Sequence, residues 1–276
     1  MKGLVRDAGK GLLLWILLVV GQSSGGVLFF RHIHPFPSDG PVDAGQALLI
    51  VNLIDAVILV LLAGRARLRG PALGLMLGGL LFGVQVFQSE IETLIFNGDI
   101  GMSGALFVAI LWSGLLRDVL AAIGIALLWR RTSKPGSKVE GLAWKAPAIA
   151  ILYILCYFCA GQMIAWQSAD VRAFYAHVDQ IGQPALVALQ FGRGLVWCGL
   201  AWLVLRTLAG PSWRTALLTG LAFSGLMIPA LLFPNPVMPW PVRSVHMVEV
   251  GVSNFLFGIL AIWILCSRIG RAMQPA

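Results

Sequence analysis

The stretch NLIDAVIL, residues 52–59, places an aspartate inside a run of leucine, isoleucine and valine. The apolar run covers roughly residues 46–63, which is long enough for a helix to cross a bilayer, since a span needs about 20 mostly apolar residues. An isolated charge at the centre of a bilayer costs between about 2.5 and more than 10 kcal/mol. The stretch therefore predicts a membrane-spanning helix whose carboxylate, Asp55, faces the protein interior and meets a cation there.

The composition of the whole chain agrees with a membrane protein. Of the 276 residues, 58% are hydrophobic and only 12% are charged, whereas soluble domains are about 25% charged. A soluble fold of this size could not hide so much apolar surface from water. The lipid bilayer is therefore the predicted surroundings. The four cysteines all fall within apolar runs, where a free cysteine is usually a small buried side chain.

Eight segments are long and apolar enough to span a membrane. They cover residues 11–30, 46–63, 71–89, 102–128, 146–166, 184–205, 215–234 and 243–266. The predicted fold class is an all-α, polytopic integral membrane protein with eight transmembrane helices. A basic start followed by an apolar segment is also typical of a cleaved signal peptide, but the duplication described below favours retention of the first span.

Basic residues are distributed very unequally between the two sides of these spans. Of the 20 lysines and arginines, three (Arg31, Arg172 and Arg243) fall on one side, and Arg117 and Arg193 lie within spans. The fifteen on the other side are Lys2, Arg6, Lys10, Arg65, Arg67, Arg69, Arg130, Arg131, Lys134, Lys138, Lys145, Arg206, Arg214, Arg268 and Arg271. Because cytoplasmic loops carry the excess of Lys and Arg, both termini are predicted to be cytoplasmic, in a cell inner (plasma) membrane. The net charge of +8 is then a topology signal, and no basic stripe with interleaved aromatic residues indicates nucleic-acid binding.

Short similarities between the two halves of the chain indicate an internal duplication. VVGQ at 19–22 is similar to CAGQ at 159–162, and RGP at 69–71 is similar to AGP at 209–211, with the same separation along the chain in both pairs. GQALLIVNL at 45–53 is similar to GQPALVALQ at 182–190, with a slightly shorter separation. Each similarity is weak alone, but the separations nearly agree. They predict two four-helix repeats, residues 1–140 and 141–276, which are parallel because four spans return the chain to its starting side.

Four charged residues lie near the centres of predicted spans: Asp55, Arg117, Asp118 and Arg193. The third similarity pairs Asp55 with Gly192, next to Arg193. Together the four charges are neutral, and buried charges are tolerated when they are paired and hydrogen-bonded. We expect Asp55 to meet Arg117 or Arg193, and Asp118 to serve the other arginine. A neutral set fits a static ionic clasp as well as it fits a path for a substrate or proton.

A second group of polar residues lies near the predicted outer face. Gln88 and Glu92 end the third span, and His246 and Glu249, three residues apart on one helix face, begin the eighth. These residues predict a hydrated vestibule or a hydrogen-bonded helix seam. Alternatively, Glu92, His246 and Glu249 could bind a divalent metal, because imidazole and carboxylate are ordinary metal ligands.

Three functions stay open from the sequence. The first is translocation of a small polar or charged solute. Its candidate substrate-binding residues are Asp55, Arg117, Asp118 and Arg193 at mid-membrane, and Gln88, Glu92, His246 and Glu249 near the outer face. The second is a membrane-embedded enzyme with a metal or acid–base site at the periplasmic face. The third is a non-catalytic subunit that binds another membrane protein.

Overall fold

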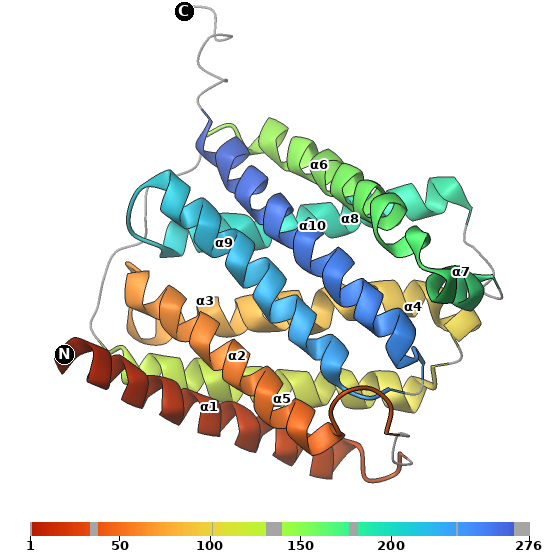
Figure 1. The fold of residues 1–276 in the computed structure, drawn as a ribbon. Helices are drawn as coiled ribbons and strands as arrows, with labels where there is room; N and C mark the ends of the chain where they lie inside the picture. The colour runs from red at the N-terminus through yellow and green to blue at the C-terminus, as the bar shows by residue number, and fades with distance from the viewer. Residues whose placement is uncertain are drawn as a thin grey trace, which may run out of the picture.

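The structure is a bundle of long helices that run between two opposite ends. The computed structural model describes residues 2–33, 38–100, 102–130, 140–176, 182–235 and 237–267, with side chains described from residue 7 onward and not for 95–100. The end at which α1 starts and α10 finishes is called the terminal face here. The opposite end, where α4 and α7 lie, is called the distal face (Figure 1).

The longer helices account for the eight predicted spans. Their bounds are α1 Lys2–Phe29, α2 Ala44–Arg65, α3 Gly70–Leu81, η1 Phe82–Phe87, α4 Gln88–Ile100, α5 Gly104–Leu128, α6 Leu142–Met163, α8 Gln183–Thr207, α9 Ser212–Met227 and α10 Trp240–Cys266. The elements α3, η1 and the first part of α4 form one continuous span, Gly70–Leu94. Short 3-10 helices η2 (Ala165–Gln167) and η3 (Ile228–Leu232) extend α6 and α9, and α7 (Ala169–Tyr175) lies at the distal face. The eight-span, all-α prediction is confirmed.

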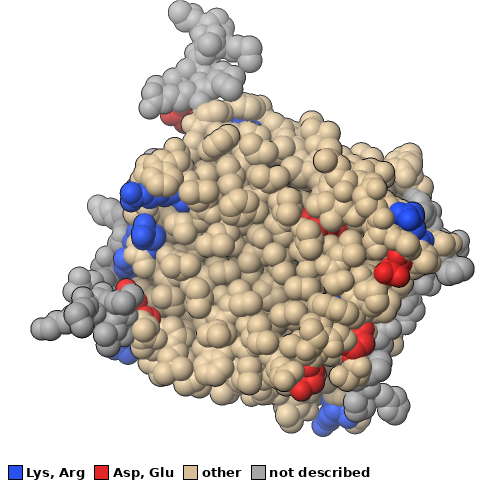
Figure 2. Space-filling view, viewed as in Figure 1, with Lys and Arg blue, Asp and Glu red and all other residues tan. Residues whose placement is uncertain are grey.

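The outside of the bundle is apolar along the middle of the helices. Figure 2 shows charged side chains mainly at the two ends of the bundle, separated by a broad band with few charges. On α2 the exposed row is Leu53, Val57 and Leu61, each 45–51% exposed and four residues from the next. Large apolar side chains so arranged would be costly in water. The chain is therefore a multi-pass membrane protein whose outer surface contacts lipid.

Glycines allow α5 to approach its neighbours closely. Gly74 and Gly78 of α3, four residues apart, lie against Ala122 and the carbonyl of Asp118 on α5. Gly21 of α1 is equally close, because a Cβ there would lie 2.8 Å from the Cα of Arg117. Small residues four apart are the usual means of close helix packing in membranes, where lipid offers no hydrophobic drive for helices to associate.

We predict that Gly74→Ala destabilises the protein by about 1–3 kcal/mol, because the added methyl group overlaps the carbonyl oxygen of Ala122 and the helices must separate. Gly79→Ala is the matched control, since a Cβ at Gly79 meets nothing within 4 Å and alanine is the better helix former. Thermal unfolding in detergent, followed by circular dichroism, measures both. Equal melting temperatures for the two variants would contradict the close packing of α3 on α5.

Reciprocal contacts join the first half of the chain to the second. At the terminal face Ala66 and Leu208 form an isolated bridge, in which Arg67 N donates to Thr207 O (2.6 Å) and Ala209 N donates to Arg65 O (2.8 Å). Deeper in the bundle, Gly83 lies against Leu200 on α8, and Gly225 lies against Ile58 on α2. Gly83 is separated from Gly225 along the chain by the same interval that separates Ile58 from Leu200.

Candidate functional site

The first polar cluster lies in the middle of the bundle. We call it the midplane cluster; its members are Gln22, Asn52, Asp55, Gln85, Arg117 and Asp118. Arg117 Nε donates to Asp118 Oδ1 at 2.7 Å, and Arg117 Nη1 lies 3.7 Å from Asp55 Oδ2. Asp55 is fully buried, and the other two charged side chains are no more than 3% exposed. One guanidinium therefore serves two carboxylates, out of contact with solvent.

Amide side chains complete the surroundings of these charges. Gln85 Nε2 donates to both Asp55 oxygens, at 3.1 and 3.2 Å, and to the carbonyl of Leu226 on α9 at 2.8 Å. Gln22 Oε1 accepts from Arg117 Nη1 at 3.2 Å and from Asn52 Nδ2 at 3.3 Å. The cluster thus joins α1, α2, η1 and α5 through side chains.

The expected partner of Asp118 was wrong. Asp118 does not serve Arg193 but pairs with Arg117, its neighbour in the chain, so that both aspartates share one arginine. The reason is the position of α8, which packs on α6, α3 and α4 and turns Arg193 toward Glu92. The prediction that Asp55 meets a cation from another helix is confirmed, and the cation is Arg117.

The second polar cluster surrounds Arg193 and is called the Arg193 cluster; it contains Gln88, Glu92, Tyr157, Gln190 and Arg193. Arg193 Nη1 lies 2.8 Å from Glu92 Oε2 and donates to Gln190 Oε1 at 3.0 Å. Gln88 accepts from Arg193 Nε at 3.3 Å and donates to the carbonyl of the same residue at 3.1 Å. Glu92 is 32% exposed, so this cluster reaches the bundle surface.

A π-helical segment connects the two clusters. Gln85 in η1 bonds Asp55, and Gln88, three residues on, bonds Arg193. In a π-helix the backbone bonds reach one residue further than in an α-helix, and such turns are frequent at functional sites. The π-helical turn thus carries Gln85 to the midplane cluster, and Gln88, directly after the turn at the start of α4, reaches the Arg193 cluster.

The third group, called the distal triad, consists of Tyr175, His246 and Glu249. His246 Nδ1 lies 2.5 Å from Glu249 Oε2, and Tyr175 Oη lies 3.3 Å from His246 Nε2. Burial, with the Glu92 and Glu249 carboxylates nearby, raises the pKa of the Tyr175 phenol. The phenol therefore keeps its proton, and the tautomer of the imidazole decides which of Tyr175 Oη and His246 Nε2 donates the hydrogen bond between them.

The structure divides the predicted vestibule between two groups. Glu92 and Gln88 bond Arg193, whereas His246 and Glu249 bond each other. In the part of the chain that the structure describes, no three His, Cys, Asp or Glu side chains gather in a way that could hold a metal ion. The proposed metal ligands Glu92, His246 and Glu249 are therefore not brought together as one ligand set, because Glu92 lies against a guanidinium.

Apolar side chains close the bundle between the midplane cluster and the terminal face. The residues that follow or precede the cluster on that side are buried in the core: Leu14, Leu18, Leu59, Leu62, Leu73, Leu77, Ala121 and Ile125. Each is at most 2% exposed. Toward the distal face the midplane cluster is therefore followed by the polar Arg193 cluster, whereas toward the terminal face it is followed by these apolar side chains.

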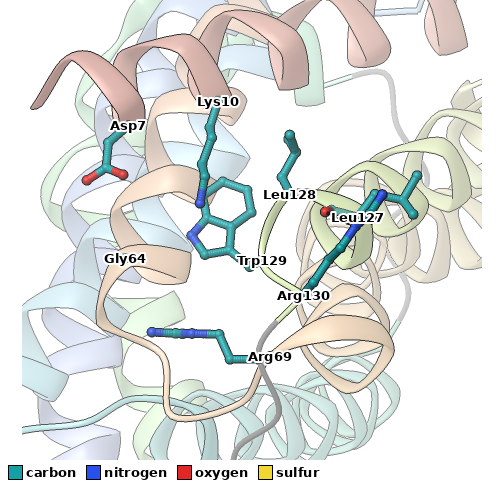
Figure 3. Close-up of a pocket in the computed structure, with 8 residues that line it drawn as sticks. All are labelled: Asp7, Lys10, Gly64, Arg69, Leu127, Leu128, Trp129 and Arg130. Atoms are coloured by element: carbon teal, nitrogen blue, oxygen red, sulfur yellow. Dashed lines mark hydrogen bonds between the residues drawn. The ribbon is translucent and has the colours of Figure 1, made fainter. Parts of the chain in front are cut away.

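A separate cavity of about 370 Å³ lies at the terminal face. Figure 3 shows Lys10 reaching over the Trp129 ring, with Nζ 4.3 Å from its centroid, and Arg69 extending beneath it. Arg69 Nη1 donates to the carbonyls of Ala63, Ala66 and Leu68. Gly64, which lines this cavity, is nine residues beyond Asp55 on α2, or about 13 Å. The cavity is therefore distinct from the three clusters.

Sequence reasoning missed Gln22 and the tyrosines as members of the site. All three tyrosines of the chain lie around these clusters: Tyr157 donates to Glu92 at 3.3 Å, and the Tyr153 ring lies 5.7 Å from the Arg193 guanidinium. Their scarcity was a usable signal. Gln22 was visible as an amide within an apolar span, and such groups usually bond across helices.

The comparisons with known proteins identify no relative. The sequence matches no protein-family model, no curated protein and no solved structure at a significant level. Any function is therefore argued from the three clusters themselves.

Proposed function

We propose that the protein translocates a small polar or charged solute across the membrane, with the midplane cluster as the central site. The observation that supports this function is the one-sided run of polar groups. It begins at Glu92, about 10 Å along its helix from Gln85, and ends at Asp55 and Asp118, with apolar side chains beyond. A buried polar site whose polar neighbours extend toward one face and not toward the other fits an occluded stage of alternating access.

The reciprocal contacts between the halves support the same proposal. Under a parallel repeat, α1 corresponds to α6, α2 to α8, α3 with α4 to α9, and α5 to α10. The pairs Gly83–Leu200 and Gly225–Ile58 are then the same contact made twice. The interval that relates these pairs makes Trp197, not Gly192, the equivalent of Asp55. Trp197 packs on Phe223 with ring centroids 4.6 Å apart. The charged centre of the first half thus corresponds to an aromatic centre in the second.

Cysteine labelling tests access to the site. In a variant with all four native cysteines replaced by alanine, we expect Glu92→Cys, at a position 32% exposed, to react rapidly with a membrane-impermeant cationic methanethiosulfonate from the distal side only. Gln88→Cys, at a position buried in this structure, should react more slowly and from the same side, as the distal end of the bundle opens during the transport cycle. The charge distribution predicts that side to be periplasmic, so spheroplasts should label and inverted vesicles should not. Leu77→Cys, buried in the apolar closure, is the matched control and should stay unlabelled from both sides.

Two results would contradict the proposal. If Gln88→Cys is unreactive from either side while Glu92→Cys reacts, then the polar run is a sealed structural clasp. If Leu77→Cys reacts as fast as Gln88→Cys, then the apolar closure does not exist.

The distal triad supports a second candidate function, acid–base catalysis at the distal face. A carboxylate that orients an imidazole, whose other nitrogen faces a hydroxyl, is an arrangement that moves protons. The observation that favours it is the Tyr175–His246–Glu249 chain, which is only partly buried. His246→Gln separates the two functions, because it should abolish an enzymatic activity but leave the labelling of Gln88→Cys intact.

A further inference from the structure

We infer that the midplane cluster binds one monovalent cation, a proton or an alkali-metal ion, between Asp55 and Asp118. The role of this cation as the coupling ion of transport rests on the proposed function. Binding of the cation to the cluster does not depend on that function. The chemistry common to both cations is a single positive charge held by carboxylate and amide oxygens.

The charge count of the cluster requires such a ligand. Asp55, Asp118 and Arg117 carry a net charge of −1 when all are ionised, and none is more than 3% exposed. An uncompensated charge at this depth costs several kcal/mol. Arg193, the other arginine within a span, is engaged by Glu92, Gln88 and Gln190 and does not compensate it.

The groups that face the cluster from neighbouring elements carry no further charge. Gln22 faces it from α1, Asn52 from α2, Gln85 from η1, and the Leu226 carbonyl from α9. All are neutral, and the carbonyl and amide oxygens are acceptors. Within the described ranges, the surroundings therefore solvate the charges but do not balance them.

Unpartnered oxygen atoms mark where a cation would lie. Asp118 Oδ2 and Asn52 Oδ1 are fully buried and make no hydrogen bond in the structure, and buried acceptors are otherwise satisfied in native proteins. Arg117 Nη2 is a buried donor in the same condition. A water molecule between Nη2 and Asp118 Oδ2 would satisfy both atoms, but it would leave the negative charge unbalanced. Water alone therefore does not complete the site.

Infrared difference spectroscopy tests the proton. In nanodiscs and sodium-free buffer, protein with Glu90→Gln should show the carbonyl stretch of one protonated carboxyl that disappears on raising the pH. Glu90 is replaced because it is a buried carboxyl with an unpartnered oxygen and would give its own band. Adding Asp55→Asn or Asp118→Asn should reduce the band at least tenfold, since either change makes the cluster neutral. Adding Asp170→Asn, which removes an exposed carboxylate outside the three clusters, is the control and should leave the band unchanged.

Sodium chloride titration, compared with choline chloride at equal ionic strength, tests the alkali ion. If the cation is sodium, its binding is saturable in calorimetry, is lost in Asp55→Asn and in Asp118→Asn, and persists in Asp170→Asn. Absence of both the carboxyl band and sodium binding overturns the inference, as does either signal surviving in both aspartate variants. Cation binding without solute flux would refute only the proposed translocation.

Discussion

Replacing Arg117 with glutamine should destabilise the protein by about 3–5 kcal/mol, because it deprives two buried carboxylates of the guanidinium that they share. The change also removes Arg117 Nη1, which donates a hydrogen bond to Gln22 Oε1. Denaturation in a detergent series, followed by tryptophan fluorescence, measures the loss. We expect this to be among the most damaging single substitutions in the chain, since a span cannot expel these charges to water without leaving the membrane.

Two further variants isolate the electrostatic part of that loss. Arg31→Gln removes an exposed arginine at the distal face and should change stability by no more than about 0.5 kcal/mol. Adding Asp118→Asn to Arg117→Gln removes one orphaned carboxylate and should recover part of the loss. If Arg117→Gln is as mild as Arg31→Gln, then water reaches the cluster and its charges are not isolated.

The membrane fold follows from the sequence because lipid imposes a length and a polarity on every span. The predicted second span, 46–63, lies within α2, Ala44–Arg65, and the interior position of Asp55 follows from the cost of exposing a carboxylate to hydrocarbon. The depth of each residue is also predictable, because it depends only on distance along the helix. Asp55, Arg117 and Arg193 are central in the structure, as expected.

The partners of these charges do not follow from the sequence. Pairing depends on how each helix is rotated about its axis, and in a bilayer the lipid-facing and inward faces are both apolar. The apolar pattern of α8 therefore does not predict how this helix is rotated about its axis. Nothing in the pattern indicates that Arg193 faces Glu92 and not Asp118. The similarity between 45–53 and 182–190 also gave a register for α2 and α8 that differs from the register of the reciprocal contacts, because Gly and apolar residues align equally well in either.

The most informative variant combines Asp55→Asn, Arg117→Gln and Asp118→Asn. It replaces each aspartate by an amide of its own size and the arginine by a shorter amide. Replacement of a buried ion set by well-packed hydrophobic residues often leaves stability unchanged or improved, and amides that bond one another likewise bury no charge. We expect the free energy of unfolding of the triple variant to differ from that of the wild type by no more than about 2 kcal/mol. We also expect its rate of cation uptake to fall at least tenfold, because the net negative charge that attracts the cation is gone.

Proteoliposomes loaded with a pH-sensitive dye, or with a sodium-sensitive one, measure this uptake under an imposed gradient. The double variant Glu92→Gln with Arg193→Gln is the control, since it neutralises a second, partly buried ion pair without changing the charge of the midplane cluster. A triple variant that is stable and still takes up the cation at the wild-type rate would show that the midplane charges only hold the helices together. A triple variant that is stable but inactive separates the two roles that the sequence left open, because packing survives the loss of charge and uptake does not.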